Sequence, residues 1–354
     1  MERQPLSPLA RRSRGLTLVE LLIAMTIGLG VLAAIAALYL NARASWRVND
    51  NLARVQDSGR FALGFLSQDL RMAGYAGCRS RQLSENEGTL YNITEAPRVA
   101  FKGSVDALRG YDNGTGWTNP TATARVRGDV IQVRHGSGMS IALANATDRV
   151  ARTVTLRHNA LGFRAGDVAL IGNCENAFLF RITNSPALTG PGNFPTVLAY
   201  AAVGPVGNNS ATVNIPRYSA ESRAEVMRYT DLSYFIGLNP AGRPALYRAA
   251  GNAAEELIDN IEDIELRYGI DTSAVPDSTI DRYVAAADVT AWNRVLAVRV
   301  SLLVAGPEDG VASQAQTYVL RDTDNDGERN AQTTNDRRLR QVFSTTVAIR
   351  NLGV

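Results

Sequence analysis

The chain has 354 residues, a formal net charge of +3, two histidines and two cysteines. Residues 1–15 hold four arginines and one glutamate, so the rest of the chain is neutral overall and offers no argument for a nucleic acid partner. So few histidines and cysteines leave little material for a zinc site or a histidine-based catalytic centre.

An apolar helix is the first predicted element. Residues 16–40 contain a single charge, Glu20, and as a helix they span about 37 Å, enough to cross a hydrocarbon core of about 30 Å. The preceding arginines place the short leader in the cytoplasm and the bulk of the chain outside. A carboxylate in the membrane costs roughly 2.5–3.5 kcal/mol, so Glu20 should have a partner.

Three interpretations of this segment compete. A cleaved secretory signal could end at Ala42-Arg43-Ala44, but signal cores are about 7–15 residues long and are not expected to carry a carboxylate. A plain membrane anchor explains the length and leaves Glu20 without a role. The third interpretation is a prepilin motif. Residues 15–25, Gly-Leu-Thr-Leu-Val-Glu-Leu-Leu-Ile-Ala-Met, resemble the cleavage and N-methylation motif of type IV pilins and type II secretion pseudopilins.

That resemblance implies that a prepilin peptidase cuts after Gly15 and methylates the new amino terminus, Leu16. The cationic amine would then lie about 6 Å along the helix axis from Glu20. In a filament the amine of one subunit can meet Glu20 of its neighbour, where the low dielectric constant strengthens the attraction and favours one axial register. The alternative is that Glu20 pairs with its own amine or reaches the lipid headgroups.

We expect the helix to continue to Met72. No proline occurs between Pro8 and Pro97, and residues 16–72 as a helix would form a rod of about 85 Å. Its second half is amphipathic and suited to packing on a globular domain. Gly28 and Gly30 mark either a soft point or a close-packing surface. Apolar and small residues recur at three- and four-residue steps: Val48, Leu52, Val55, Gly59, Ala62, Leu66 and Leu70.

From about residue 79 the chain becomes rich in Gly, Asn, Thr and Pro, with short alternating apolar runs. This pattern predicts a β-rich head, large enough for one sizeable core or two lobes, and an α+β fold. A short amphipathic helix is predicted over 255–263, and 295–305 should be a central strand. The other predicted strands are 126–133, 150–156, 167–171, 178–182, 211–215, 226–236, 264–270, 316–320 and 341–351. The predicted divisions are a leader (1–15), a transmembrane half (16–40) and an outer half (41–74) of the helix, and the head (75–354).

Cys78 and Cys174 lie outside the membrane by the orientation argument, in a compartment that permits disulfides. A bond between them could stabilise the head by up to about 4–5 kcal/mol. The alternative is two separately buried thiols.

Asp322, Asp324 and Asp326 stand at alternating positions before Gly327 and resemble the first half of a calcium loop. Thr333 occupies the twelfth position, where a bidentate glutamate would be expected, so an exposed turn without metal competes with a calcium site. Otherwise we expect no cofactor. His135 and His158 are interpreted as turn residues. No nucleophile or phosphate-binding motif is visible, so the sequence does not favour an enzyme.

Several segments beyond the N-terminal motif resemble PilW-type minor pilins. The segments are 56–63, 69–78, 166–174 and 338–351. The resemblance implies a non-enzymatic, low-abundance pilus subunit that works with other minor pilins and the major pilin, at or near the tip. It also implies an inner-membrane protein with a periplasmic head that is later assembled into the surface pilus. A J-like type II secretion pseudopilin and an adhesive or ligand-binding head are the alternatives. Many major pilins carry a proline in the membrane helix, and this chain has none there.

Overall fold

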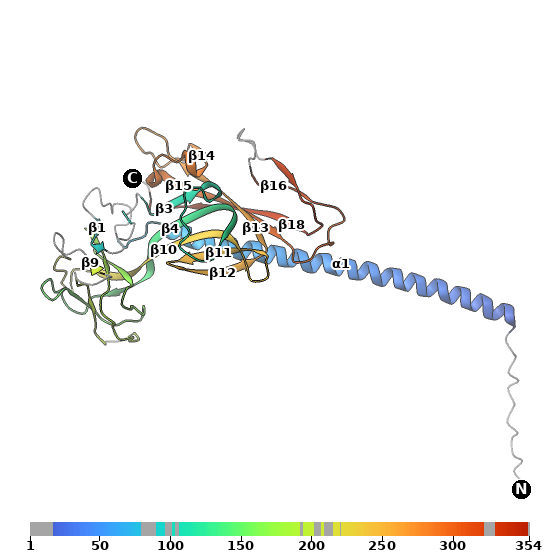
Figure 1. Cartoon of the computed structure of the whole chain (residues 1–354), viewed down its shortest axis with the longest axis horizontal. Coiled ribbons are helices and arrows are strands. Elements are labelled where there is room, and N and C mark those ends of the chain that lie inside the picture. Colours follow the sequence, from blue (N-terminus) through green and yellow to red (C-terminus); the bar gives the residue numbers. More distant parts are fainter. Residues whose placement is uncertain are drawn as a thin grey trace, which may run out of the picture.

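The computed structural model describes residues 17–78, 90–95, 101–102, 106–191, 194–201, 207–208, 215–219, 221–321 and 330–352. A single long helix, α1 (Leu18–Met72), extends from a β-rich head (Figure 1). Its 55 residues correspond to a rod of about 80 Å. The expected α+β architecture, with a long N-terminal helix packed on a β-rich head, is therefore confirmed.

Local chemistry explains both ends of α1. Thr17 is the N-cap, and its Oγ1 accepts a hydrogen bond of 3.3 Å from the Glu20 backbone N–H. The helix ends at Ala73, whose N–H donates to the Leu70 carbonyl, and Gly74 follows with φ of +75°. A residue with a side chain would be strained at that φ, so the glycine allows the chain to turn away.

The larger sheet has eight strands, and its organising strand is β10 (Glu225–Leu238). One edge of β10 pairs with β4 (Arg125–Ala142), which in turn pairs with β3 (Leu108–Tyr111). Along the opposite edge of β10, its first residues pair with β6 and its last residues with β11. The remaining members are β1 (Leu90–Asn92), β6 (Val168–Gly172), β7 (Ala177–Arg181), β11 (Pro244–Ala250) and β12 (Ala253–Asp259).

A four-stranded sheet completes the main core, in the order β14-β13-β15-β18. Its strands are β13 (Ile261–Ile270), β14 (Arg282–Val284), β15 (Val295–Ala305) and β18 (Arg340–Ala348). β15 lies between β13 and β18, so the predicted central strand is confirmed with its bounds. The anchored part of α1 packs against β15 and β18 and also against β4 and β12.

Short elements complete the head. The small pairs are β2 (Thr94–Glu95) with β9 (Gly207–Asn208), β5 (Thr153–Leu156) with β8 (Thr196–Ala199), and β16 (Thr317–Val319) with β17 (Ala331–Thr333). Within the described ranges, the 3₁₀ turns are η2 (Asp112–Gly114), η3 (Ala286–Asp288) and η4 (Trp292–Arg294). β1 and β9 lie at the end of the head away from the projecting part of α1 (Figure 1).

The head contains two principal hydrophobic clusters that share strands. Alternate residues of β6 and β7 belong to different clusters: Leu170 and Leu179 face the cluster that includes α1, whereas Ile171 and Phe180 face the other. Successive strand residues point to opposite faces, so one continuous sheet separates the two cores.

The structure contradicts the helix predicted over 255–263. Residues up to Asp259 form strand β12, Asn260 has φ of +58°, and β13 begins at Ile261. The pattern was misleading because Glu262, one of the polar residues of the predicted amphipathic helix, is buried in a strand and paired with arginines.

Two smaller expectations also differ. His135 is a buried residue within β4 and not part of a turn, because the strand continues to Ala142. The strand predicted from residue 150 begins only at Thr153, because the Asp148 side chain accepts hydrogen bonds from the Val150 and Ala151 N–H groups in a turn. Residues 211–214 of another predicted strand lie outside the described residues.

Candidate assembly interface

The N-terminal part of α1 projects from the head (Figure 1). We call residues 18–46 the free segment; every one of them is exposed. Large apolar side chains occupy all its sides, among them Leu22, Ile27 and Leu32, each more than half exposed. Within the described chain, α1 is the one helix long and apolar enough to cross a membrane. A helix that is apolar all round needs lipid or other helices around it.

Glu20 lies in the first turn of the free segment, at the positive end of the helix dipole. Its carboxylate is exposed and makes no hydrogen bond or ion pair with any part of the chain that the structure describes. Its partner must therefore come from outside these residues. Gly15 and Leu16, the predicted processing site, lie outside the described residues, so their role stays a prediction.

Residues 47–72 of α1, which we call the anchored segment, are fixed to the head by a narrow stripe. The buried members of the stripe are Asn51, Val55, Gly59, Ala62, Leu66 and Leu70. This confirms the predicted spacing from Val55 onward. Val48 and Leu52 remain more than a third exposed, and the buried position near them is Asn51. Its side-chain amide donates to the Arg47 carbonyl and its Oδ1 accepts from the Glu308 N–H, which allows an asparagine to be buried there.

Gly59 allows β18 to approach the helix closely. A Cβ on Gly59 would lie 2.6 Å from the nearest ring carbon of Phe343, closer than side chains can pack. Because Phe343 lies opposite Leu302 of β15, the contact fixes the four-stranded sheet to one level of the helix.

Polar contacts hold both ends of the anchored segment. Near its C-terminal end, the Tyr234 hydroxyl of β10 donates a hydrogen bond to the Asp69 carboxylate. The pKa of Tyr234 is raised well above its ordinary value, mainly because the hydroxyl is buried and also because the Asp69 carboxylate is negatively charged. The Asn351 side chain donates to the Ala73 carbonyl at 3.2 Å. Where α1 leaves the head, Arg47 pairs with Glu308 at 3.0 Å. Both of the last two side chains are almost half exposed, so this ion pair contributes little to stability.

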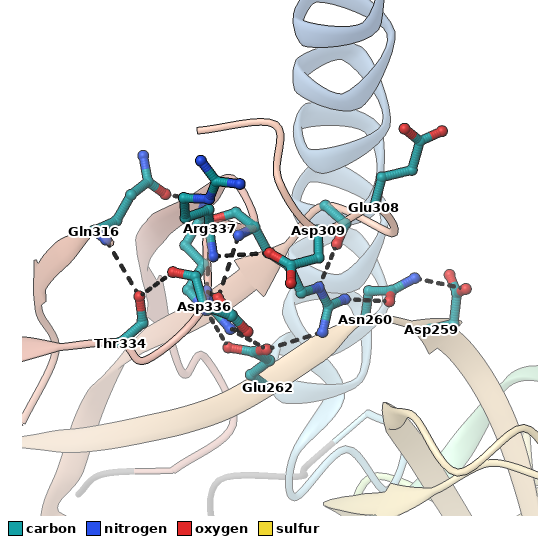
Figure 2. Close-up of polar contacts among 12 residues, drawn as sticks. Asp259, Asn260, Glu262, Glu308, Asp309, Gln316, Thr334, Asp336 and Arg337 are labelled. Atoms are coloured by element: carbon teal, nitrogen blue, oxygen red, sulfur yellow. Dashed lines mark hydrogen bonds and ion pairs between the residues drawn. The ribbon is translucent and has the colours of Figure 1, made fainter. Parts of the chain in front are cut away.

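A buried ion network lies beside this exit point. Arg340 of β18 holds Glu262 of β13 in a bidentate pair, with N···O distances of 2.6 and 2.9 Å, and also contacts Asp336. Arg338 donates to the Glu262 carboxylate, the Asn260 side chain and the Gly306 carbonyl. Figure 2 shows Glu262, Asn260 and Asp336 converging next to α1.

The charges in this network compensate one another. Burial alone would lower the pKa of Arg340, but hydrogen bonds to Asp336 and Glu262 outweigh it and raise that pKa. The same hydrogen bonds from Arg340 lower the pKa of Asp336 to about 2. Removing one partner would leave an uncompensated buried charge. The network therefore has a structural role, in which it holds β13, β18 and the chain after β15 together.

A second buried arginine links the two sheets. Arg321 pairs with Asp129 of β4 at 3.1 Å and holds Asp263 of β13 in a bidentate contact, at 2.7 and 3.0 Å. Sequence reasoning missed Arg321, Arg338, Arg340 and their carboxylate partners. The available signal was Glu262-Asp263 between apolar residues of a strand, since buried carboxylates of this kind need arginines.

The structure contains the expected disulfide between Cys78 and Cys174, with 5.1 Å between their Cα atoms. It ties the chain just after α1 to the turn between β6 and β7, and thus the helix end to the second cluster.

The proposed calcium ligands Asp322, Asp324 and Asp326 lie outside the described residues. Elsewhere in the described chain no three His, Cys, Asp or Glu side chains gather as a metal site. Calcium binding by this loop therefore stays a prediction, which titration calorimetry of the full chain with calcium would test.

Comparisons with known families agree with this geometry. Residues 10–37 match the prokaryotic N-terminal methylation motif, and residues 233–351 match the family described as type IV pilus-assembly protein W. Searches among curated proteins and solved structures found no match. The motif at the head of a projecting apolar helix defines a protein of the type IV pilin class. The second match extends from the middle of β10 to just past the end of β18, and shows that this part of the chain is similar to PilW-type pilins.

Proposed function

We propose that this protein is a minor pilin, incorporated into the type IV pilus and active in priming filament assembly at or near the tip. In this role it supports twitching motility and adhesion through the filament and catalyses no reaction. Its partners are the prepilin peptidase, other minor pilins and the major pilin.

The observation that carries this proposal is the contrast within α1. The free segment is apolar on all sides and has Glu20 in its first turn, whereas the anchored segment is buried by the head of its own chain. Before assembly the membrane surrounds the free segment. In the filament neighbouring helices replace the lipid, and Glu20 meets the methylated amine of Leu16 on another subunit.

The proposed arrangement in the cell follows from the same helix. The leader, residues 1–15, is removed, residues 16–40 cross the inner membrane, residues 41–74 continue outside it, and the head from residue 75 lies in the periplasm. A periplasmic head is compatible with the disulfide between Cys78 and Cys174.

The main competing function is that of a J-like pseudopilin of type II secretion. The methylation motif is common to both systems, but the match of residues 233–351 to a pilus-assembly family favours the pilus. Deletion of the gene should therefore reduce surface pili and leave secretion of folded enzymes intact. Loss of secretion with normal piliation would favour the pseudopilin.

Glu20→Ala tests the role of the carboxylate in assembly. We expect normal insertion into the membrane and a strong loss of the protein from sheared pili, measured by quantitative immunoblot. Glu221→Ala, at an exposed position in the head, is the matched control and should behave as wild type. Normal recovery of the Glu20 variant in pili would contradict the proposed role.

Processing is tested by intact mass measurement of the protein purified from membranes. We expect a chain that begins at methylated Leu16, and Gly15→Leu should retain the leader. A native chain beginning at Met1 or at Ser45 would instead indicate an ordinary anchored or exported protein.

A further inference from the structure

One cavity lies on the face of the larger sheet turned away from α1, and a second adjoins it at the edge strand β3. In β10, Tyr234 and Ile236 point into the core that contains α1, while Phe235 between them belongs to a separate cluster on the opposite face. Ser233 shares the face of Phe235 because strand residues alternate. The cluster on this face contains no residue of α1.

The first cavity, which we call the aromatic cavity, has a volume of about 310 Å³. Its aromatic wall is Trp117 with Tyr111. Trp117 packs on Phe235 with 5.2 Å between ring centres, and Phe235 packs on Tyr247 at 5.7 Å. The indole is thus supported from below and remains half-buried at the cavity.

A chain of hydrogen bonds fixes the polar wall of the aromatic cavity. The Tyr111 hydroxyl donates to the Gln132 side-chain oxygen at 3.2 Å, and the Gln132 amide donates to Asp231 at 2.8 Å. Arg134 donates to the other Asp231 oxygen at 3.1 Å and is itself held by the Asp106 carbonyl. These planar groups therefore have fixed orientations before any ligand arrives, which reduces the entropy lost on binding.

Ser233 adds a hydroxyl to the same cavity. The residue is only 4% exposed and lines the cavity. A hydroxyl at the cavity wall can both donate and accept a hydrogen bond, so it suits the hydroxyl groups of a ligand.

A second cavity, of about 400 Å³, shares Tyr111 and Gly116 with the first. The Arg109 guanidinium lies 5.5 Å from the centre of the Trp292 ring at this cavity, and Arg109 is exposed. The nearby Asp112 carboxylate is already engaged, because it accepts hydrogen bonds from the Ala286 and Ala287 N–H groups. Arg109 is therefore available to a ligand anion.

We propose that the two cavities bind an oligosaccharide, with one sugar ring against Trp117 and a carboxylate-bearing sugar beside Arg109. A sugar ring has an apolar C–H face that packs on an indole, and hydroxyl groups at its edge that bond to planar polar side chains such as Gln132 and Asp231. Two adjoining cavities that share Tyr111 and Gly116 in their walls suit a chain of at least two rings. This site does not depend on the role of the helix in assembly.

The experiment uses the full chain in a detergent without a sugar headgroup, applied to an array of immobilised neutral and uronate-containing oligosaccharides. Proline-rich peptides are printed beside them, because an aromatic groove could hold those instead. Thr118→Trp fills the aromatic cavity from an exposed position, and Trp117→Ala removes the platform. Trp46→Ala, which removes an exposed indole from α1, is the matched control.

We expect wild type and Trp46→Ala to bind the same oligosaccharides, and Thr118→Trp and Trp117→Ala to bind at least tenfold more weakly. Arg109→Gln should weaken binding of uronate-containing chains more than that of neutral ones. Because Trp117→Ala could unfold the head, Thr118→Trp decides if the two disagree. No retained oligosaccharide, wild-type binding by Thr118→Trp, or retention of the peptides alone would overturn the proposal.

Discussion

The free and anchored segments of α1 belong to one uninterrupted helix but meet different surroundings. In residues 18–46 every position is exposed and the apolar side chains lie on all sides. In residues 47–72 a single stripe is buried, while charged side chains such as Arg54 and Asp57 remain on the outer side. The same secondary structure thus serves two purposes.

This difference shows where the partner of each segment comes from. A narrow stripe is satisfied by one surface, and the head of the same chain provides it. An apolar surface on all sides cannot be satisfied by one contact, so lipid or several helices must surround it. Substitutions in the anchored segment should therefore change stability, and those in the free segment should change only insertion or assembly.

The largest expected effect comes from removing the disulfide that follows the anchored segment. Replacing Cys78 and Cys174 together by serine opens a link across 96 residues, so we expect a loss of about 4–5 kcal/mol in the free energy of unfolding. Chemical denaturation of the full chain in detergent measures this loss. Wild type treated with a reductant should move in the same direction, and an unchanged midpoint in both would contradict the prediction.

A matched pair of leucine substitutions compares the segments directly. Leu66 has no exposed surface, whereas Leu32 is 63% exposed. Leu66→Ala should lower the free energy of unfolding by about 2–5 kcal/mol, because it removes packed methyl groups and leaves a cavity. Leu32→Ala should leave the denaturation midpoint of the head unchanged. Equal effects of the two substitutions would remove the distinction between the segments.

Two glycines within the anchored segment sharpen the comparison further. Gly64→Ala faces open space and should stabilise the protein by about 0.5–1 kcal/mol, since glycine is a poor helix former. Gly59→Ala gains the same propensity but pushes against the Phe343 ring, so a net loss of about 1 kcal/mol is expected. Thermal unfolding of the two variants should therefore shift in opposite directions.

The smallest expected effect is the change in stability at low pH when Asp336 is substituted. Because the folded-state pKa of Asp336 is about 2, below its ordinary value of 3.8, its contribution to stability is present above the ordinary pKa and is lost as pH falls from about 4 through 2. Asp336→Asn should flatten the decline of stability in this window, measured by denaturation at several pH values. Asp288→Asn, at an exposed carboxyl, serves as the control.

Much of this architecture was predictable from periodicity. The helix to Met72 and the strand Val295–Ala305 follow from patterns that local geometry imposes, and the disulfide pair was the one pairing that two cysteines allow. The failure over residues 255–263 has a physical cause. Glu262 and Asp263 are buried, and the arginines that compensate them come from residues about 60 to 80 positions further along the chain.

The sequence by itself determined the free segment and Glu20, because a helix in lipid needs only local hydrogen bonds and apolar side chains. Only the tertiary structure decided which face of α1 packs against β18, which arginine pairs with which carboxylate, and that Trp117 and Asp231 line the same cavity. Those contacts join residues far apart in the chain, and their formation depends on how the two sheets pack, which no local pattern specifies.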